Sequence, residues 1–428
     1  MLLAGCAGCL LGQEYGGPAI LSRGDLPLSG APASMAFRPY MGLSGFYDNG
    51  LLPVSVSPNG HVPVADSFGE ELDLGLNGYH AWEGTKLSLD YRGDFRHYTL
   101  GYYDSSDHFL ALTLAHQLRK HVTFSLRNQV GTYAQNYFLS GFGYLYPNYL
   151  QTPQNDIYDN RVIFASTGGS LIFQKSARLS FSIGGEGDVV RRRSTALYGD
   201  TVAAGRGDVE YRITRHTTIG ADYHFMHFDF TRGFGYSNIH SVGANYSTQF
   251  TRHVQLSARI GGARVESESL ISAPINPAIA AIIGQSVGIQ AAHRLSYAPD
   301  MLARLSYTLR RESFGLVYNN ALSPGNGVYL TSRMQTGHAF YSYTGIRYWN
   351  FGVDGGYDRL SALTQNIGAY SSYGGGGGAT RTLGKGFHAV LRLDARHFNV
   401  AQSFFLHNEY RAMLGLNWSP GEVPLALW

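Results

Sequence analysis

Apolar and polar residues alternate along most of this chain, with the period of two that is typical of β-strands. Between residues 86 and 97, every second residue is apolar or glycine, and the residues between them are polar or charged. The same alternation recurs at 206–213 and at 387–396. Because helical spacing is nearly absent, the chain is predicted to be all-β, with strands that carry one apolar and one polar face.

The alternating segments are long for β-strands. Most run about 11 to 16 residues, whereas strands of globular proteins average about 5 to 6. A strand that crosses a bilayer at a tilt needs about 9 to 11 residues. Eighteen strands are predicted, near 36–48, 69–80, 85–98, 106–118, 121–133, 157–174, 178–193, 200–214, 216–230, 238–251, 253–266, 285–298, 301–314, 330–343, 346–360, 366–382, 386–399 and 405–418.

The connections between these segments alternate between short and long. Short turns are predicted near 82–85, 119–121, 175–178, 214–216, 251–253, 298–300, 344–345 and 383–386, with longer segments such as 134–156 and 268–284 between them. Lipid offers no hydrogen-bond partners, so a sheet inside a bilayer must close on itself. The predicted fold is therefore a transmembrane antiparallel up-and-down β-barrel of about 18 strands (16–18), with short turns in the periplasm and long loops outside.

Composition narrows the classes of protein further. The chain holds 54 Gly, 30 Tyr and 23 Phe, only 15% of its residues are charged, and its net charge is +3. That charge is too small for a nucleic-acid-binding surface, so no nucleic-acid partner is expected. No apolar run reaches the 18 or more residues of a membrane-spanning helix, which excludes a helical membrane protein.

The two ends of the chain differ from the alternating part. The apolar start at residues 1–12 predicts a secretory signal peptide, although it lacks a positively charged beginning. Both cysteines, Cys6 and Cys9, lie within it. The expected organisation is a signal at 1–12, a periplasmic N-terminal extension at 13–35, a transmembrane barrel at 36–418 and a C-terminal tail at 419–428.

The last predicted strand ends in an aromatic residue, and Tyr410, Leu414, Leu416 and Trp418 share one of its faces. This stretch resembles the C-terminal signal that barrel assembly machinery recognises, although here residues 419–428 follow it. The chain over residues 36–418 resembles Gram-negative outer-membrane β-barrel proteins of the porin-like kind. The resemblance implies a place in the bacterial outer membrane, contact with its lipid and recognition by the assembly machinery, and it leaves the oligomeric state open.

Charged residues on the polar faces are expected to line the inside of the barrel. Thirteen acidic residues and thirteen arginines fall there, which predicts weak ion selectivity, since a ring of one sign is what discriminates between ions. Arginine also suits fixed ion pairs, because its planar fork matches a carboxylate. The principal predicted wall residues are Asp90, Arg92, Asp94, Arg96, Glu186, Asp188, Arg206, Asp208, Glu210, Arg212, Arg392, Asp394, Arg396, Glu409 and Arg411.

Two loop segments leave alternatives open. The aromatic side chains of residues 133–158 could stack against sugars and guide them, or they could form the outer aromatic girdle of the barrel. The candidate guiding residues are Tyr137, Phe138, Phe142, Tyr144 and Tyr146. The apolar segment 275–283 could fold into the barrel as a constriction or cap it from outside.

The run SSYGGGGGATRTLGKG, residues 371–386, comes near to a phosphate-binding P-loop. Ala379 stands where that motif has its first glycine, and Gly386 stands where it has a hydroxyl. The surrounding alternation instead predicts a strand at 366–382 and a turn at 383–386 that contains Lys385. Consecutive glycines would let this strand bend.

The function expected from these features is that of a porin-like channel for passive diffusion of small polar or saccharide solutes. No nucleophile elbow and no cluster of metal-ligating residues occurs in the alternating part, so neither an enzyme, a metal site nor a cofactor is expected. Two alternatives remain open: an outer-membrane component for export of polysaccharide or exopolysaccharide, and a structural or adhesive barrel with a closed lumen.

Overall fold

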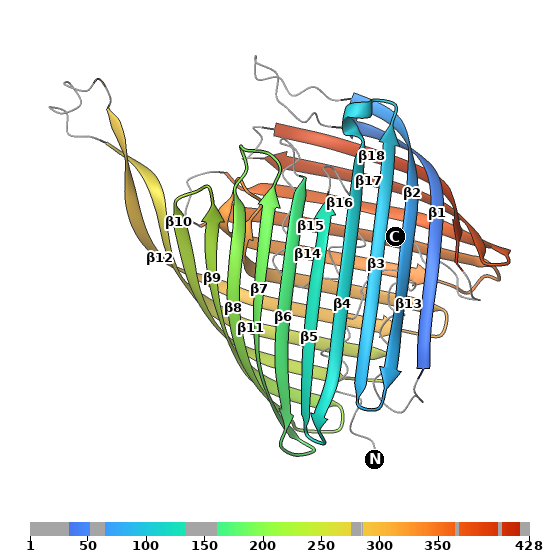
Figure 1. The fold of residues 1–428 in the computed structure, drawn as a ribbon, viewed down its shortest axis with the longest axis horizontal. Coiled ribbons are helices and arrows are strands. Elements are labelled where there is room, and N and C mark those ends of the chain that lie inside the picture. Colours follow the sequence, from blue (N-terminus) through green and yellow to red (C-terminus); the bar gives the residue numbers. More distant parts are fainter. Residues whose placement is uncertain are drawn as a thin grey trace.

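The structure, a computed structural model, describes residues 34–51, 65–133, 161–274, 284, 286–363, 368–400 and 405–419. Within these ranges the chain forms one antiparallel sheet of 18 strands that closes on itself (Figure 1). The predicted all-β, up-and-down barrel is therefore confirmed. No helix in the described ranges has the length and apolar character that crossing a membrane requires.

The strands are β1 (Ser34–Leu51), β2 (Ala65–Trp82), β3 (Thr85–Tyr98), β4 (Ser105–Arg119), β5 (Val122–Tyr133), β6 (Val162–Gln174), β7 (Leu179–Arg192), β8 (Gly199–Arg212), β9 (Thr217–Thr231), β10 (Gly235–Gln249), β11 (Val254–Pro274), β12 (Val287–Thr308), β13 (Glu312–Gly325), β14 (Leu330–Tyr343), β15 (Trp349–Ala362), β16 (Tyr370–Gly384), β17 (Phe387–Val400) and β18 (Phe405–Trp418). One 3-10 turn, η2 (Gly101–Tyr103), lies between β3 and β4.

The barrel closes where the first strand meets the last. β1 pairs with β18 from Met41↔Trp418 to Asn49↔Tyr410, and its other edge pairs with β2. Every further strand pairs with its neighbours in sequence. Closure removes the free edges that would otherwise leave backbone N–H and C=O groups facing lipid.

The two faces of the sheet have reversed polarity compared with a soluble protein. On β3, Leu87 and Phe95 are 40% and 42% exposed, whereas Arg92, Asp94 and Arg96 are buried. Other strands repeat this pattern, with exposed apolar residues that include Leu43, Phe68, Ile163, Ile183, Val242, Ile260, Val353 and Leu414. An apolar outer face around a polar inner face is the arrangement that a bilayer selects for a membrane-spanning barrel.

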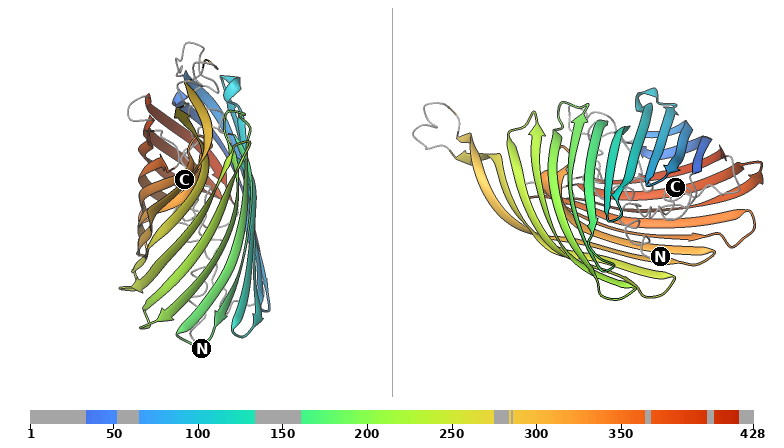
Figure 2. Two further views of the ribbon diagram at one scale, coloured as in Figure 1. Left: turned by 90° about the vertical axis from the view of Figure 1, so that its left-hand side faces the viewer. Right: turned by 60° about the horizontal axis from the view of Figure 1, so that its bottom comes forward.

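The barrel is flattened rather than round. β3 to β9 cross the strands of the opposite wall at a steep angle in Figure 1, and the side view in Figure 2 is clearly narrower. The β11–β12 hairpin also rises beyond its neighbours. β10 and β11 pair only as far as Gly235↔Ser269, whereas β11 and β12 stay paired to Pro274↔Val287.

The predicted turn at Ala298–Asp300 is wrong, because β12 runs straight through it. Pro299 lies within the strand, opposite Gly262 of β11. On its other edge, β12 pairs with β13 only from Met301↔Asn320 to Thr308↔Ser313. Pro299 therefore breaks no ladder bond to β13, which is where proline is tolerated in a sheet. The actual turn lies between Thr308 and Glu312.

The pairing between β12 and β13 ends at Met301↔Asn320. Farther from the short β12–β13 turn, the two strands separate. Beyond Met301 and Asn320, the next residues on each side include a proline, Pro299 on β12 and Pro324 on β13. Proline has no N–H to donate to a ladder. The two prolines explain in physical terms why this seam does not close and why the end of β13 is free to leave the wall.

The glycine run is a strand, as predicted. Gly375 lies in register between Gly355 of β15 and Ala395 of β17. Backbone groups engaged in two ladders cannot cradle a phosphate. The turn that follows is also confirmed, with Gly384, Lys385 and Gly386 all at positive φ.

Gly376 makes room for an ion pair. A Cβ at this position would press on the carboxylate of Asp394 and come within 2.8 Å of Arg392 Nη2, whereas a Cβ at Gly377 meets Val353 Cγ1 at 3.3 Å and the carbonyl oxygen of Gly352 at 3.6 Å. We expect Gly376→Val to destabilise the barrel by about 1 to 3 kcal/mol through overpacking, and Gly377→Val to have little effect. The fraction of protein that keeps the mobility of the folded barrel on an unheated gel measures this. Equal loss in both variants would contradict the explanation and favour the bending role.

Candidate functional site

A network of buried charges on the inner face joins β2, β3, β4 and β18. Arg96 lies at its centre, with its Nε 3.0 Å from Glu71 Oε1 and its Nη1 2.6 Å from Asp107 Oδ2. Glu71 also binds Arg411 of β18, and Arg411 approaches Asp48 of β1. Because each arginine contacts two or more carboxylates, the network ties the first and last strands of the barrel together.

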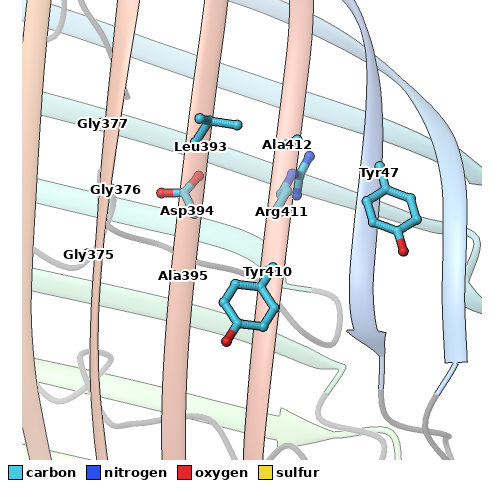
Figure 3. A pocket seen from close by; sticks show the side chains of 10 residues that line it. All are labelled: Tyr47, Gly375, Gly376, Gly377, Leu393, Asp394, Ala395, Tyr410, Arg411 and Ala412. Carbon is cyan, nitrogen blue, oxygen red and sulfur yellow. The ribbon is translucent and has the colours of Figure 1, made fainter.

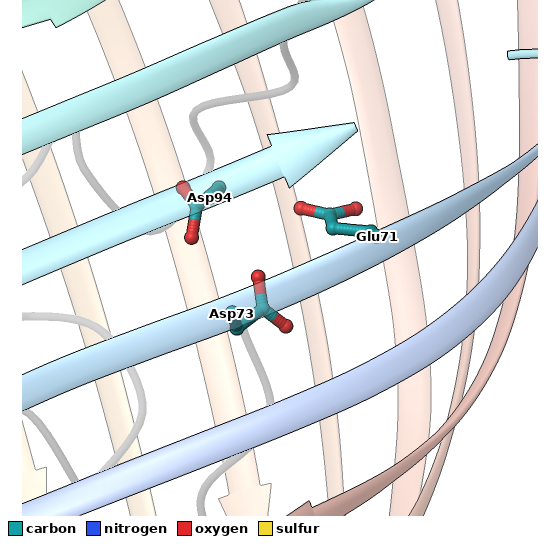
Figure 4. A group of neighbouring side chains, drawn as sticks. All are labelled: Glu71, Asp73 and Asp94. Atoms are coloured by element: carbon teal, nitrogen blue, oxygen red, sulfur yellow. The ribbon is translucent and has the colours of Figure 1, made fainter. Parts of the chain in front are cut away.

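Three carboxylates gather beside this network. Oxygen atoms of Glu71, Asp73 and Asp94 lie within 4.8 Å of one another (Figure 4). Their oxygens are of the kind that Mg²⁺ or Ca²⁺ prefers. Arg96 and Arg411 pair with Glu71, and Arg96 Nη2 also lies 3.6 Å from Asp94 Oδ2, so two of the three carboxylates already have arginine partners.

Two further networks lie on other parts of the inner face. Arg392 of β17 binds Asp394 and Asp354, with its Nη2 2.7 and 2.9 Å from their Oδ1 atoms. Arg259 of β11 binds Asp222 and Asp300, both at 2.6 Å. Arg392 thus links β17 to β15 across the intervening β16, and Arg259 links β11 to the neighbouring β12 and, across β10, to β9.

All predicted wall residues lie on the face opposite the exposed apolar side chains. Arg92 binds Asp90 at 2.7 Å, Asp208 accepts a hydrogen bond from Ser182, and Arg396 Nη2 donates to the hydroxyl of Tyr370 at 2.8 Å. Glu186, Arg206, Glu210, Arg212 and Glu409 share the strand positions of this face. That they line a solute path stays a prediction.

Sequence reasoning missed several partners on this face. Asp300 was assigned to a turn, and Asp48, Asp107 and Asp200 stand near strand ends, where boundaries are least certain. The alternation alone could have found Asp48 and Asp107, since each lies an even number of positions from buried residues of its own strand. Their contacts to arginines of adjacent strands required the register.

The connection between β3 and β4 is held by Asp104. Its carboxylate accepts the Tyr98 backbone N–H at 2.8 Å and contacts His97 Nδ1 at 2.9 Å. Slight burial acts to raise the pKa of Asp104, but these two donors outweigh it and lower the pKa below its ordinary value. The stabilisation is therefore present above the ordinary carboxyl pKa and is lost as pH falls through the lowered one.

The end of the β13–β14 hairpin folds into the barrel. We call residues 321–334 the β13–β14 tip. Gly325 and Gly327, both at φ 90°, shape its turn. The carbonyl of Gly327 accepts the backbone N–H of Tyr198, from the β7–β8 connection, at 3.1 Å. Ser237 Oγ of β10 lies 2.6 Å from Thr331 Oγ1 of β14, although these strands are not ladder neighbours.

Apolar residues pack around this tip on the inner face. Leu322 and Leu330 of the tip meet the inner faces of β8 to β12, where the cluster includes Val202, Met226, Phe228, Phe230, Ile239, Ala263, Val265 and Ala298. On its other side, Tyr329 and Met334 pack against Leu360 and Tyr370. Two sheet layers are thus in contact inside the barrel, and the tip narrows the interior at the end of the long loops.

The outer face has a shallow hollow over the glycine run. Gly375 and Gly377 form its floor, and Tyr47, Leu393 and Tyr410 rise around it, enclosing about 500 Å³ (Figure 3). The missing side chains of the glycines create this hollow. It lies on the lipid-facing side and takes no part in the interior.

The residues of the predicted assembly signal are on the outer face of β18. Tyr410, Leu414 and Leu416 are exposed, and Trp418 pairs in register with Met41 and Phe387. Recognition of this strand by assembly machinery stays a prediction.

Several predicted features lie outside the described residues. These are the signal at 1–12, nearly all of the extension at 13–35, the tail beyond residue 419, the apolar segment 275–283 and the candidate guiding aromatics Tyr137, Phe138, Phe142, Tyr144 and Tyr146.

No protein-family model and no curated protein matches the chain. Among solved structures, it is similar to OccK5 (OpdH) of Pseudomonas aeruginosa, with 14% identity, a TM-score of 0.43, and coverage of 92% of this chain and 98% of that one. It is also similar to the outer membrane protein OpdK of that organism, with 13% identity, a TM-score of 0.43, and coverage of 90% and 99%. OccK2 (OpdF), solved in complex with glucuronate, gives 12% identity, a TM-score of 0.43, and coverage of 90% and 98%. At these identities and TM-scores, the similarity says nothing about which solute this chain binds or which of its residues form a site. By its own closed ladder and apolar outer face, the chain is an 18-stranded antiparallel β-barrel of the membrane-spanning type.

Proposed function

We propose that the protein is a channel for passive diffusion of small polar solutes across the outer membrane and that it performs no catalysis. The observation that carries this proposal is the polar inner face, where arginines and carboxylates of several strands pair with one another. Barrels of 16 to 18 strands are wide enough to enclose an aqueous channel. A wall of ion pairs holds water at its surface. Polar solutes can exchange their hydrogen bonds to water for hydrogen bonds to these charged side chains as they pass.

The β13–β14 tip sets the limit on what passes. Its contacts with Tyr198 and Ser237 hold it across the interior, so solutes must pass beside it. Small solutes are therefore favoured over polymers. A barrel with a closed lumen is the second candidate, and the two-layer packing around Leu322 is the observation that favours it.

Single-channel recording tests the proposal. Purified protein added to a planar lipid bilayer should give discrete, repeated open steps, and the same protein denatured by heat should give none. A silent membrane, with the barrel shown to be inserted by its folded gel mobility, would contradict the channel and support the closed barrel.

A further inference from the structure

Two carboxylates beside the β13–β14 tip differ from the others on the inner face. We propose that Asp188 and Asp200 form a binding site for the ammonium or guanidinium group of a small solute. The inference rests on the proposed function, and it names the class of solute that the narrowed part of the channel recognises.

The ladder places these two residues close together. Asp188 of β7 pairs with Val202 of β8, and Val190 pairs with Asp200. The two aspartates therefore stand diagonally opposite each other on one face of adjacent strands, within reach of a single ligand. Each is only 3% exposed.

Three of their four carboxylate oxygens are buried without a hydrogen-bond partner, although Ser166 pairs opposite Asp188 in the ladder and Arg192 attracts Asp200. These oxygens are both of those of Asp188 and the Oδ1 of Asp200. By contrast, Glu71, Asp107, Asp222 and Asp394 each bind an arginine. A buried carboxylate without a partner is costly, and a cationic ligand would offset that cost.

The nearest arginine, Arg192, attracts Asp200 and also donates a hydrogen bond beside the tip. Arg192 follows Val190 on the same face of β7, and its Nε donates to the carbonyl of Tyr198 at 3.0 Å. The backbone N–H of Tyr198 in turn donates to Gly327 of the tip. With two carboxylates and one guanidinium, the site keeps a net negative charge where the tip narrows the interior.

Apolar neighbours favour an organic cation. Val202, which pairs with Asp188, and Phe230, which pairs with Asp200, belong to the buried apolar cluster. Exclusion of water strengthens a charge–charge contact, and an alkyl stem can lie along the cluster. An amine carried on a short carbon chain matches both properties.

Calorimetric titration of the full-length protein in detergent tests this site. The probe is agmatine, which joins an ammonium and a guanidinium group by a four-carbon chain. The matched control ligand is 4-guanidinobutanoate, in which a carboxylate replaces the ammonium group. We expect one agmatine to bind per barrel and the control ligand to bind at least about tenfold more weakly, since hydrogen bonds to charged groups are stronger than those between neutral groups.

Variants locate the binding. Asp188→Asn and Asp200→Asn should each weaken agmatine binding at least about tenfold. Asp229→Asn removes the same charge from the outer face of β9, where Asp229 contacts His227, and should leave binding unchanged. Folded gel mobility confirms that each variant still forms a barrel.

The outcomes separate this inference from the channel itself. Wild-type affinity in the Asp188→Asn/Asp200→Asn double variant, or no binding of agmatine to the wild type at millimolar concentration, would overturn the site. If agmatine binds but the bilayer stays silent, the channel fails and the site stands. If the channel conducts and agmatine does not bind, only the site fails.

Discussion

A Ser237→Cys/Thr331→Cys variant should lock the β13–β14 tip against the wall. In its oxidised form it should give only the small conductance steps of the narrowed channel. The two hydroxyl oxygens lie 2.6 Å apart, so sulfur atoms in their place need little movement to reach the disulfide length of about 2.0 Å. The only native cysteines, Cys6 and Cys9, precede the described residues. The bond would fix in place the hairpin that narrows the interior.

The lock should also stabilise the barrel. The cross-link would close a loop of 94 residues, which the chain-entropy account values at about 4.7 kcal/mol. Urea titration in oxidising and reducing buffer measures this difference, and either single cysteine variant is the control. Large conductance steps in the oxidised form would show that the tip does not limit the path.

Arg96→Leu should be the most destabilising single substitution on the inner face. Arg96 is 6% exposed and contacts Glu71, Asp94 and Asp107. Its loss leaves several buried carboxylates facing one another, and breaking a buried pair in this way costs about 3 to 5 kcal/mol. The free energy of unfolding, measured by urea titration of the folded gel band, is the readout.

Arg264→Leu is the matched control for that prediction. Arg264 pairs with Glu266, but both side chains are on the outer face and about half exposed. An exposed pair of this kind contributes about 0 to 1 kcal/mol. Similar losses of stability in the two variants would show that the inner network does not hold the barrel together.

The barrel itself could be predicted from the sequence because the bilayer imposes a rule on every strand. Residues that alternate in polarity, such as Leu87 and Ser88, must face lipid and interior in turn, and length then separates a spanning strand from a soluble one. The prediction failed at Pro299, where a residue usually read as a turn is tolerated because β12 has no partner on that side.

The β13–β14 tip could not be predicted in this way. Leu316, Tyr318 and Leu322 share one face of β13, and the alternation places all three toward lipid. The first two are exposed, whereas Leu322 is 5% exposed and packs inside the barrel. Only the parted seam and the apolar wall opposite it decide this, and that wall includes residues more than 90 positions away in the sequence, such as Val202 and Phe228.

The site at Asp188 and Asp200 was partly within reach of the sequence. Alternation assigned Asp188 to the inner face, but it could not show that Arg192 Nε donates to the carbonyl of Tyr198 and that both oxygens of Asp188 have no hydrogen-bond partner. Whether a buried charge is paired depends on the register between neighbouring strands and on the direction of each side chain. Neither can be predicted from the sequence pattern.

The most direct test of the account compares the single-channel conductance of the wild type with that of a variant in which Asn326–Tyr329 is replaced by two glycines. The shortened tip loses the contacts of Gly327 with Tyr198 and of Tyr329 with Gly368. The account predicts small steps for the wild type and distinctly larger steps for the variant. Equal conductance, or silence in both with the barrels inserted, would contradict a channel narrowed by this tip.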